Sequence, residues 1–219
     1  MYLTVTRWQP ILKAMSASGS EIGTRAVEDL VDKALSLKPA PAPLDHVQLL
    51  LNTRNLLGGY DLLSDDSTAR RCLAVIAKRD GQRAPRDLDE AELSRLREVR
   101  EAVRVLLLSH ATGPRQGDEA LERLRAAGAA VLLSVDVDDS GSPVAVPPSD
   151  SRGLQRIAAQ VMAAVVSADR DQLHRLKACV NPDCGWVFFD TSRSRSGTWC
   201  AMNVCGARHK MERYRNRRD

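Results

Sequence analysis

Four cysteines near the C-terminus have the spacing of a structural metal site. Cys179 and Cys184 form one Cys-x4-Cys pair, and Cys200 and Cys205 form a second, with 15 residues between the pairs. Two such pairs can place four thiolates around one tetrahedral zinc ion. The alternatives are four free thiols or two disulfides. Because the sequence shows neither a secretory leader nor a long apolar run, we expect a cytoplasmic protein with reduced cysteines, which favours zinc.

Four thiolates would complete the coordination shell of the zinc ion, and this argues against an enzyme. A catalytic zinc keeps one position open for water. His209 follows Cys205 by four residues but is not needed as a ligand. The remaining histidines, His46, His110 and His174, have no metal-site or catalytic-triad spacing. We therefore expect a structural metal and no catalysis.

The charge of the chain is unevenly distributed. The 219 residues carry a net charge of +4, with 43% hydrophobic and 27% charged residues, as in an ordinary globular protein. Residues 170–219 carry +6 and residues 1–169 carry −2. Four thiolates and one zinc ion would reduce the tail to about +4. A basic segment beside a metal site favours binding to nucleic acid, and a solvated tail is the alternative.

A helix is expected over residues 206–218. In such a helix Ala207, Met211 and Tyr214 would form a narrow apolar stripe, which we expect to pack on the metal module. Basic side chains would flank this stripe and reach DNA phosphates. With two arginines of the preceding loop, the predicted DNA-binding residues are Arg193, Arg195, Arg208, Lys210, Arg213, Arg215, Arg217 and Arg218.

The rest of the sequence predicts a mainly α-helical fold. Apolar residues recur at helical spacing after Thr24, from Leu44 to a Leu-Leu-Gly-Gly break, after Ser67, over Asp89–His110, over 119–127 and after Pro148. We expect that Ser149, Asp150 or Ser151 caps the last of these helices, and that a short helix through Leu173 and Leu176 leads to Cys179. The convincing strand pair is 131–137 with 143–146, around an Asp-Asp-Ser-Gly turn. Cys72 is expected to pack as a small hydrophobe.

The helix over Asp89–His110 has a second face on which acidic and basic residues alternate. Such alternation is typical of a solvated face with ion pairs along the helix. We expect pairs between Glu92 and Arg95 and between Arg97 and Glu101. The residues expected to face solvent are Glu92, Arg95, Arg97, Glu98, Arg100, Glu101 and Arg104.

The C-terminal residues resemble the CGNR zinc-finger family. The resemblance lies in Leu176–Cys179, Asn181–Gly185, Phe188–Arg193, Trp199–Met202 and Cys205–Lys210. It implies a zinc finger that binds DNA in a bacterial transcription regulator. The chain departs from the family pattern at Ala207, where the family has asparagine, and at Gly197 and Thr198, where two arginines are usual. These departures remove contacts that a partner could use.

Upstream residues resemble the ABATE domain that usually precedes this finger. The resemblance lies in 49–56, 97–102 and the predicted hairpin. We expect three segments: residues 1–43, an extension with a short helix and a proline-rich linker; residues 44–170, an ABATE-like helical domain with a β-hairpin near 131–147; and residues 171–219, a CGNR-like finger with a basic C-terminal helix.

The resemblance also implies stress-related regulation through a small ligand at the N-terminal domain. Asn52, Thr53 and Arg54 follow an apolar run and could point into a ligand pocket, or could equally cap or end a helix. A homodimer is a further candidate assembly. The alternative function is a zinc-stabilised adaptor that binds protein or RNA without sequence-specific DNA binding.

Overall fold

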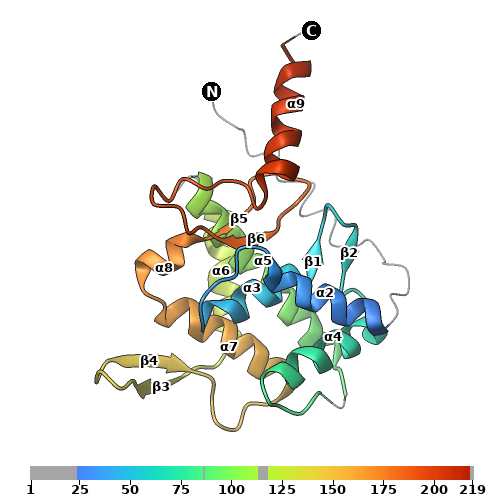
Figure 1. Ribbon diagram of the computed structural model, residues 1–219. Coiled ribbons are helices and arrows are strands. Elements are labelled where there is room, and N and C mark those ends of the chain that lie inside the picture. The colour runs from blue at the N-terminus through green and yellow to red at the C-terminus, as the bar shows by residue number, and fades with distance from the viewer. Residues whose placement is uncertain (1–23, 86, 113–117, 218–219) are drawn as a thin grey trace.

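The computed structural model describes residues 24–85, 87–112 and 118–217, which form a mainly helical protein with three small hairpins (Figure 1). The helices are α2 (Thr24–Ser36), α3 (Leu44–Asn52), α4 (Asp66–Arg79), α5 (Glu90–Thr112), α6 (Asp118–Ala129), α7 (Gly153–Ser167), α8 (Arg170–Arg175) and α9 (Ala207–Arg215), with a π-helical turn, η3 (Met202–Gly206). The hairpins are β1 (Arg54–Asn55) with β2 (Tyr60–Asp61), β3 (Ser134–Val137) with β4 (Pro143–Val146), and β5 (Leu176–Ala178) with β6 (Val187–Phe189). Within these ranges, no helix combines the length and apolar character needed to span a membrane.

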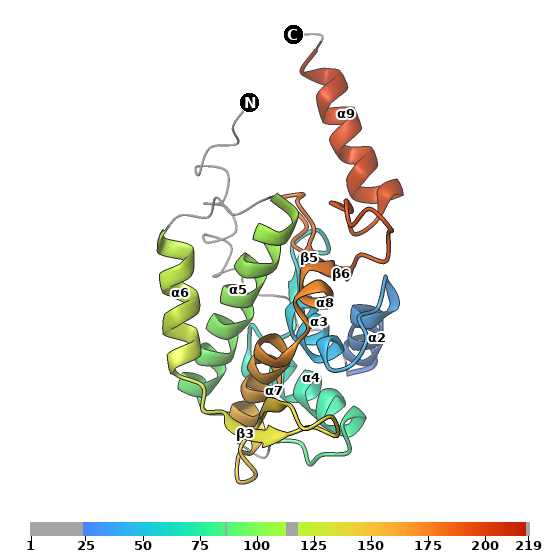
Figure 2. The same cartoon turned by 90° about the vertical axis from the view of Figure 1, so that its left-hand side faces the viewer.

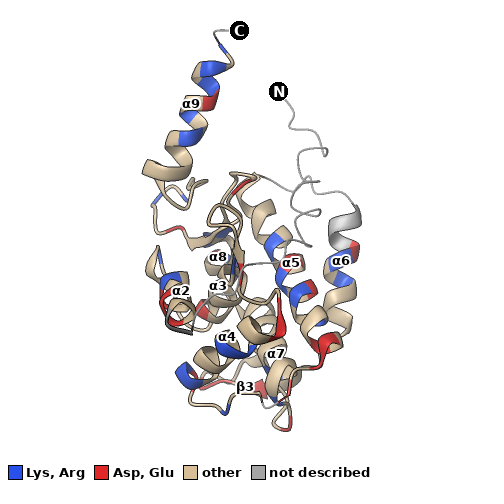
Figure 3. Ribbon diagram, turned by 90° about the vertical axis from the view of Figure 1, so that its right-hand side faces the viewer, with Lys and Arg blue, Asp and Glu red and all other residues tan. Residues whose placement is uncertain are grey.

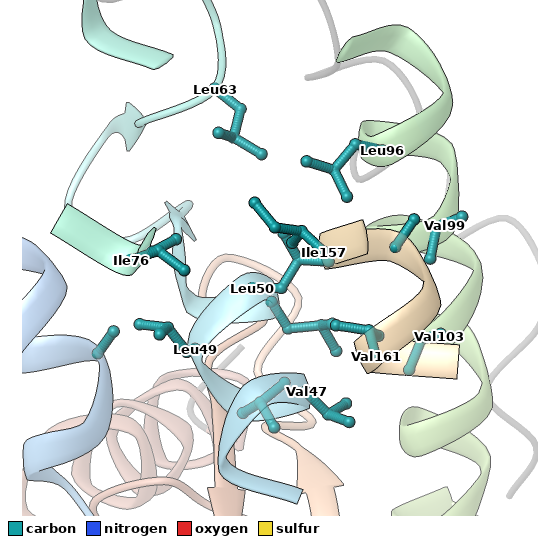
Figure 4. Close-up of a cluster of buried hydrophobic side chains, with 14 of the residues drawn as sticks. Val47, Leu49, Leu50, Leu63, Ile76, Leu96, Val99, Val103, Ile157 and Val161 are labelled. Carbon is teal, nitrogen blue, oxygen red and sulfur yellow. The ribbon is translucent and has the colours of Figure 1, made fainter. Parts of the chain in front are cut away.

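The short helix α3 lies at the centre of the helical core, which comprises α2 to α7. It contacts α2, α5 and α7, and β6 reaches it from the C-terminal side. Val47, Leu49 and Leu50 are almost fully buried, and Figure 4 shows Leu50 beside Ile157 of α7 and Leu49 near Ile76 of α4. A helix enclosed on several sides needs apolar residues at successive positions. This explains the unbroken run of leucines at its end.

The predicted helices are found in the structure, and α2 is in addition part of the helical core. α5 buries the predicted apolar positions Leu93, Leu96, Val99, Val103 and Leu107. Cys72 is fully buried in α4, as predicted. The N-terminal helix α2 buries its own apolar face against α3 and α4, so it is part of the helical core. Residues 1–23 of the predicted extension and the predicted break at 113–117 lie outside the described residues.

The predicted hairpin is confirmed, and two further hairpins appear. Ser134 pairs with Val146 and Val137 pairs with Pro143, while the Asp138 carboxylate accepts hydrogen bonds from the backbone of Ser140 and Ser142. The strands of the β1–β2 and β5–β6 hairpins are only two or three residues long, so they have too few positions to show an alternating pattern.

Two local predictions about helix ends were wrong. Leu176 begins strand β5, because α8 ends at Arg175 and the chain then turns to pair with Phe189. The residue that precedes α7 is Arg152, which makes no side-chain capping bond, rather than one of the three predicted capping residues.

The prediction of a solvated charged face on α5 was wrong for its C-terminal half. Arg100 and Arg104 are only 2% and 4% exposed. Arg100 donates to both carboxylate oxygens of Asp61 at 2.7 and 2.6 Å, and Glu101 accepts from Arg100 at 2.9 Å and from Arg104 at 3.0 Å. Arg54 lies 3.5 Å from Glu101. The hairpin β1–β2 supplies Arg54 and Asp61, so alternating charges here form a buried network.

The predicted pairs within α5 also have other partners. Arg97 donates to Glu90 at 2.7 Å and to the carbonyl oxygen of Leu63 at 2.6 Å, instead of pairing with Glu101. Glu92 accepts from Gln155 of α7 at 2.6 Å instead of pairing with Arg95. Arg97 thus pairs within α5 with Glu90 and also binds the backbone before α4, while Glu92 binds a residue of α7.

Glu101 should make folding stability depend on pH. Burial opposes its ionisation, but Arg104, Arg100 and Arg54 outweigh this effect and lower its pKa from 4.5 to about 2. Its stabilisation is complete above the unfolded-state pKa and is lost as the pH falls through about 2. We expect Glu101→Gln to lower the free energy of unfolding by about 3 kcal/mol at neutral pH, measured by urea denaturation. The difference from the parent protein should shrink towards pH 2, and a constant difference would contradict the assignment.

Candidate metal centre and basic helix

The four predicted cysteines converge on one point in the structure. Their Sγ atoms all lie within 4.8 Å of one another, and all four residues are buried. Antiparallel pairing of Ala178 with Val187 brings Cys179 and Cys184 together at one end of the β5–β6 hairpin. Cys205 lies in η3, and its backbone N–H donates to the carbonyl of Ala201 at 3.0 Å. Four cysteines that span 26 positions of the sequence thus form one compact cluster.

The geometry fits a tetrahedral ion held by thiolates. Zinc–sulfur bonds of about 2.3 Å place neighbouring sulfurs of a tetrahedron about 3.8 Å apart. The Sγ atoms of Cys184 and Cys200 are 3.7 Å apart, as are those of Cys200 and Cys205. The side-chain amide of Asn181 donates to the Cys205 sulfur at 3.6 Å, as expected of a group that orients a metal ligand. Four protein ligands leave no open coordination position.

Without a metal ion, the cluster favours one thiolate, at Cys179, and raises the pKa of Cys184 and Cys200. Hydrogen bonds from Cys184 and Cys200 lower the pKa of Cys179 to about 3, and the same interactions raise the pKa of Cys184. Cys72 behaves differently, since burial in α4 raises its pKa to about 12. Of the five cysteines, Cys72 is thus the one built into an apolar core as a neutral thiol.

Aromatic residues complete the metal module, which we call the finger (residues 176–206). Trp186 and Phe188 are buried against the cysteines, and Trp199 packs beside them. Phe189 belongs instead to the helical core, together with Val187. Because neighbouring strand residues point to opposite faces, β6 is shared between the two cores.

Buried polar side chains join the finger to the helical core. Asn52 accepts from the Val187 N–H at 2.7 Å and donates to the Val187 carbonyl at 2.9 Å. Gln48 donates to the same carbonyl at 3.3 Å. Arg104 donates to the carbonyls of Gly185 and Leu51. Three side chains therefore fix the backbone immediately after Cys184.

The three predicted pocket residues are all buried among protein groups. Asn52 also donates to the carbonyl of Ala34 at 2.9 Å. Thr53 donates to the Leu50 carbonyl at 2.7 Å and accepts from Arg100 at 3.1 Å. Arg54 lies in the charged network of α5. These contacts show residues that brace the interior, and a ligand pocket at this place stays a prediction.

The basic helix α9 is present, but its apolar stripe does not pack on the finger. Met211 and Tyr214 are 54% and 55% exposed, and Ala207 is exposed as well. Figures 1 and 2 show α9 projecting from the body, and its principal contacts are with η3. His209 lies against Trp199 with ring centroids 5.0 Å apart, so the first turn of α9 is the part that touches the finger. The packing prediction was wrong because the helix leaves at an angle.

The predicted DNA-binding residues divide into two groups. Arg208, Lys210, Arg213, Arg215 and Arg217 are exposed on or just after α9, where Figure 3 shows basic residues along the helix. The other group lies in the loop after β6: Arg193 is exposed, and Arg195 donates to both oxygens of Asp171 at 2.8 and 2.6 Å. Arg218 lies outside the described residues.

An open groove of about 840 Å³ separates α9 from the finger. Arg208, Met211 and Arg215 line its helix side, while Trp199 and Pro182 lie among the residues on its finger side. Sequence reasoning missed this groove because it assumed that the stripe would close against the finger.

Gly197 has a structural reason for being glycine. A Cβ atom there would lie 2.8 Å from the carboxylate carbon of Asp190. That carboxylate accepts from the Gly197 N–H at 2.7 Å and from the buried Lys177 ammonium at 2.9 Å. Hydrogen bonds from Ser192 and Lys177 outweigh the effect of burial and lower the pKa of Asp190. A larger residue at position 197 would separate the ion pair.

Two family models match the chain. The CGNR zinc finger model matches residues 175–218. The ABATE model, described as "Putative stress-induced transcription regulator", matches residues 44–169, which is more than half of the chain. No curated protein matches the chain. The resemblance seen in the sequence is thereby confirmed for both segments, in the same order.

The joint between Asn52 and Val187 should contribute strongly to stability. Asn52→Leu would leave the N–H of Val187 and two carbonyl oxygens without this partner in a dry interior, at a cost of about 2–4 kcal/mol. Urea denaturation measures the loss. Arg125→Ala, which breaks an exposed ion pair with Glu122, serves as the control and should change stability by less than about 0.5 kcal/mol. Equal effects of the two substitutions would contradict a structural role for Asn52.

The metal content of the purified protein should follow the cysteine cluster. We expect one zinc ion per chain by elemental analysis, and loss of that ion in Cys200→Ser, because three thiolates and a hydroxyl make a poorer site. Cys72→Ala provides the matched control and should retain the full zinc content. Zinc retained at full occupancy by Cys200→Ser would exclude the four-cysteine centre.

Proposed function

The chain belongs to the ABATE family and ends in a CGNR zinc finger, and on this premise we propose that it regulates transcription by binding duplex DNA through α9 and the adjoining finger. The observation that carries the proposal is the exposure of α9. Residues 207–217 have five basic side chains and one acidic one, on a helix that projects from the body.

The size and charge of α9 suit the major groove. An α-helix with its side chains is about 10–12 Å wide, and the major groove is about 12 Å wide. Phosphates on both groove walls would neutralise the basic side chains on the two flanks of the helix. A helix of nine residues is marginally stable by itself, so binding would also stabilise it.

The proposed role of zinc is to fix the base of α9. Cys205 belongs to η3, and α9 begins two residues later at Ala207. A zinc ion bound by the four cysteines would supply folding free energy and keep η3 rigid. Trp199 then provides the surface on which His209 rests. The metal would thus orient the helix, and no reaction at the metal is involved. We place this regulator in the cytoplasm, where its thiols would remain reduced.

A protein-binding adaptor is the second candidate, and the exposed apolar side chains favour it. Met202, Val204, Met211 and Tyr214 are 40% to 61% exposed on the finger and α9. Exposed apolar side chains on neighbouring elements are typical of an interface with another protein. An adaptor that binds a protein would do so with little dependence on salt. An adaptor that binds RNA would prefer single-stranded RNA to duplex DNA.

Salt dependence tests the DNA proposal directly. With about five to seven phosphate contacts, the logarithm of the association constant should fall with the logarithm of salt concentration with a slope near −5 to −6. Reversing the charges of Arg213, Arg215 and Arg217 to glutamate should make the slope shallower by about 3 units and weaken binding strongly. Fluorescence anisotropy with a labelled duplex measures both quantities.

A matched triple variant controls for net charge. Lys78, Arg83 and Arg95 are exposed on the helical core, and their reversal to glutamate changes the net charge by the same amount. This variant should keep the steep salt slope. If both triple variants weaken binding equally, the attraction is only a general charge effect, and α9 is not the DNA-binding element.

A further inference from the structure

We propose that a second basic site, distant in sequence from α9, binds a phosphate group. It is an open pocket of about 170 Å³ where α5, α8, β5 and the loop after β6 meet. The lining residues are His110, Arg170, Asp171, His174, Lys177 and Arg195. Three permanent cations and two imidazoles therefore surround one carboxylate.

Lys177 forms the fixed positive floor of the pocket. It is 3% exposed, and its ammonium donates to Asp190 at 2.9 Å and to the carbonyls of Arg195 and Gly197 at 2.5 and 3.2 Å. These three bonds use all of its donors. Lys177 thus holds the loop that carries Arg195 and is not a ligand contact.

The cations at the rim remain available. Arg170 is exposed and forms no ion pair with any residue in the described part of the chain. Arg195 forms a bidentate pair with Asp171, and both side chains are exposed, at 44% and 63%. An exposed pair of this kind is worth at most about 1 kcal/mol. An incoming phosphate could therefore take the place of the Asp171 carboxylate on Arg195.

Two stacked histidines line the pocket, His110 from α5 and His174 from α8. The rings of His110 and His174 have centroids 4.5 Å apart and are inclined by 9°. Nδ1 of His110 lies 3.3 Å from the carbonyl oxygen of Leu176, so it carries a proton. Stacked imidazoles repel one another when both are protonated, because like charges then lie within a few ångströms. A doubly charged anion nearby would offset that repulsion.

These features together select a phosphate. Guanidinium groups match the oxygens of phosphate in bidentate geometry, and a dianion can be shared by two arginines. A divalent cation is disfavoured, since Arg170, Lys177 and Arg195 surround the one carboxylate. The phosphate could belong to a free phosphorylated molecule or to a DNA backbone, and the geometry of the pocket is the same for both.

Isothermal titration calorimetry with inorganic phosphate on the full-length zinc-loaded protein tests the site, with imidazole nitrogen NMR to locate it. We expect saturable binding that shifts the resonances of His110 and His174. Arg170→Glu should weaken binding by at least about tenfold, since a hydrogen bond between charged groups is worth about 1.5–3 kcal/mol. Asp171→Asn should tighten binding, because it removes the carboxylate that competes for Arg195.

The control is Arg152→Glu, an exposed arginine before α7 at a different pocket, which should leave phosphate binding unchanged. A parallel titration with duplex DNA distinguishes the two sources. If Arg170→Glu weakens DNA binding while inorganic phosphate fails to bind, the site takes backbone phosphates. If phosphate binds and DNA affinity is unaffected, it takes a free phosphate. The proposal is overturned if Arg170→Glu binds both phosphate and DNA as the parent protein does, or if Asp171→Asn binds phosphate more weakly. If only the α9 variants fail to change DNA binding, the DNA proposal is lost and the phosphate proposal is unaffected.

Discussion

The paired hydrogen bonds between Asn52 and the backbone of Val187 are the interaction on which the arrangement of this protein depends. A carboxamide can satisfy the N–H and the carbonyl of one residue at once, and here it does so at 2.7 and 2.9 Å from the last residue of a central helix. Buried backbone groups need such partners, because each unpaired one costs about 1–3 kcal/mol. The Asn52 side chain thereby makes the hydrogen bonds that a neighbouring strand would otherwise make to Val187. It holds the β5–β6 hairpin, whose strands have only three residues each, against the core.

This joint makes the metal module part of the core. Arg104 reaches Gly185, between Cys184 and Trp186, and its other bonds go to Glu101 and Leu51. The charged network of α5 is therefore continuous with the backbone beside the proposed metal ligands. A small rearrangement of α5 against α3 would move two donors to the finger together. The same contacts that stabilise the fold provide a physical connection between the ABATE region and the DNA-binding helix that we propose.

Sequence reasoning succeeded where the pattern was local and repeated. The spacing of the cysteines predicted a cluster that the structure brings within 4.8 Å, and helical spacing located α2, α4, α5, α6 and α7. It failed where a residue's environment comes from elsewhere in the chain. Arg100 and Arg104 look like surface residues until the hairpin with Asp61 folds over them, and Asn52 looks like a helix end until Val187 arrives. The burial of a charge depends on partners 39 and more residues away, which periodicity cannot show.

The projection of α9 follows from how little of it the finger can cover. The finger's apolar residues are used around the cysteines, and Trp199 offers one ring to His209 in the first turn. Four cations lie on this nine-residue helix, Arg208, Lys210, Arg213 and Arg215, and they repel one another. Gly197 belongs to the same reasoning, since the carboxylate that pairs with Lys177 occupies the space of a side chain there. An arginine at this position would have to open the Lys177–Asp190 pair, so the chain gives up one basic contact in the loop to keep that pair closed. The basic side chains of α9 are therefore left exposed, where a polyanion could reach them.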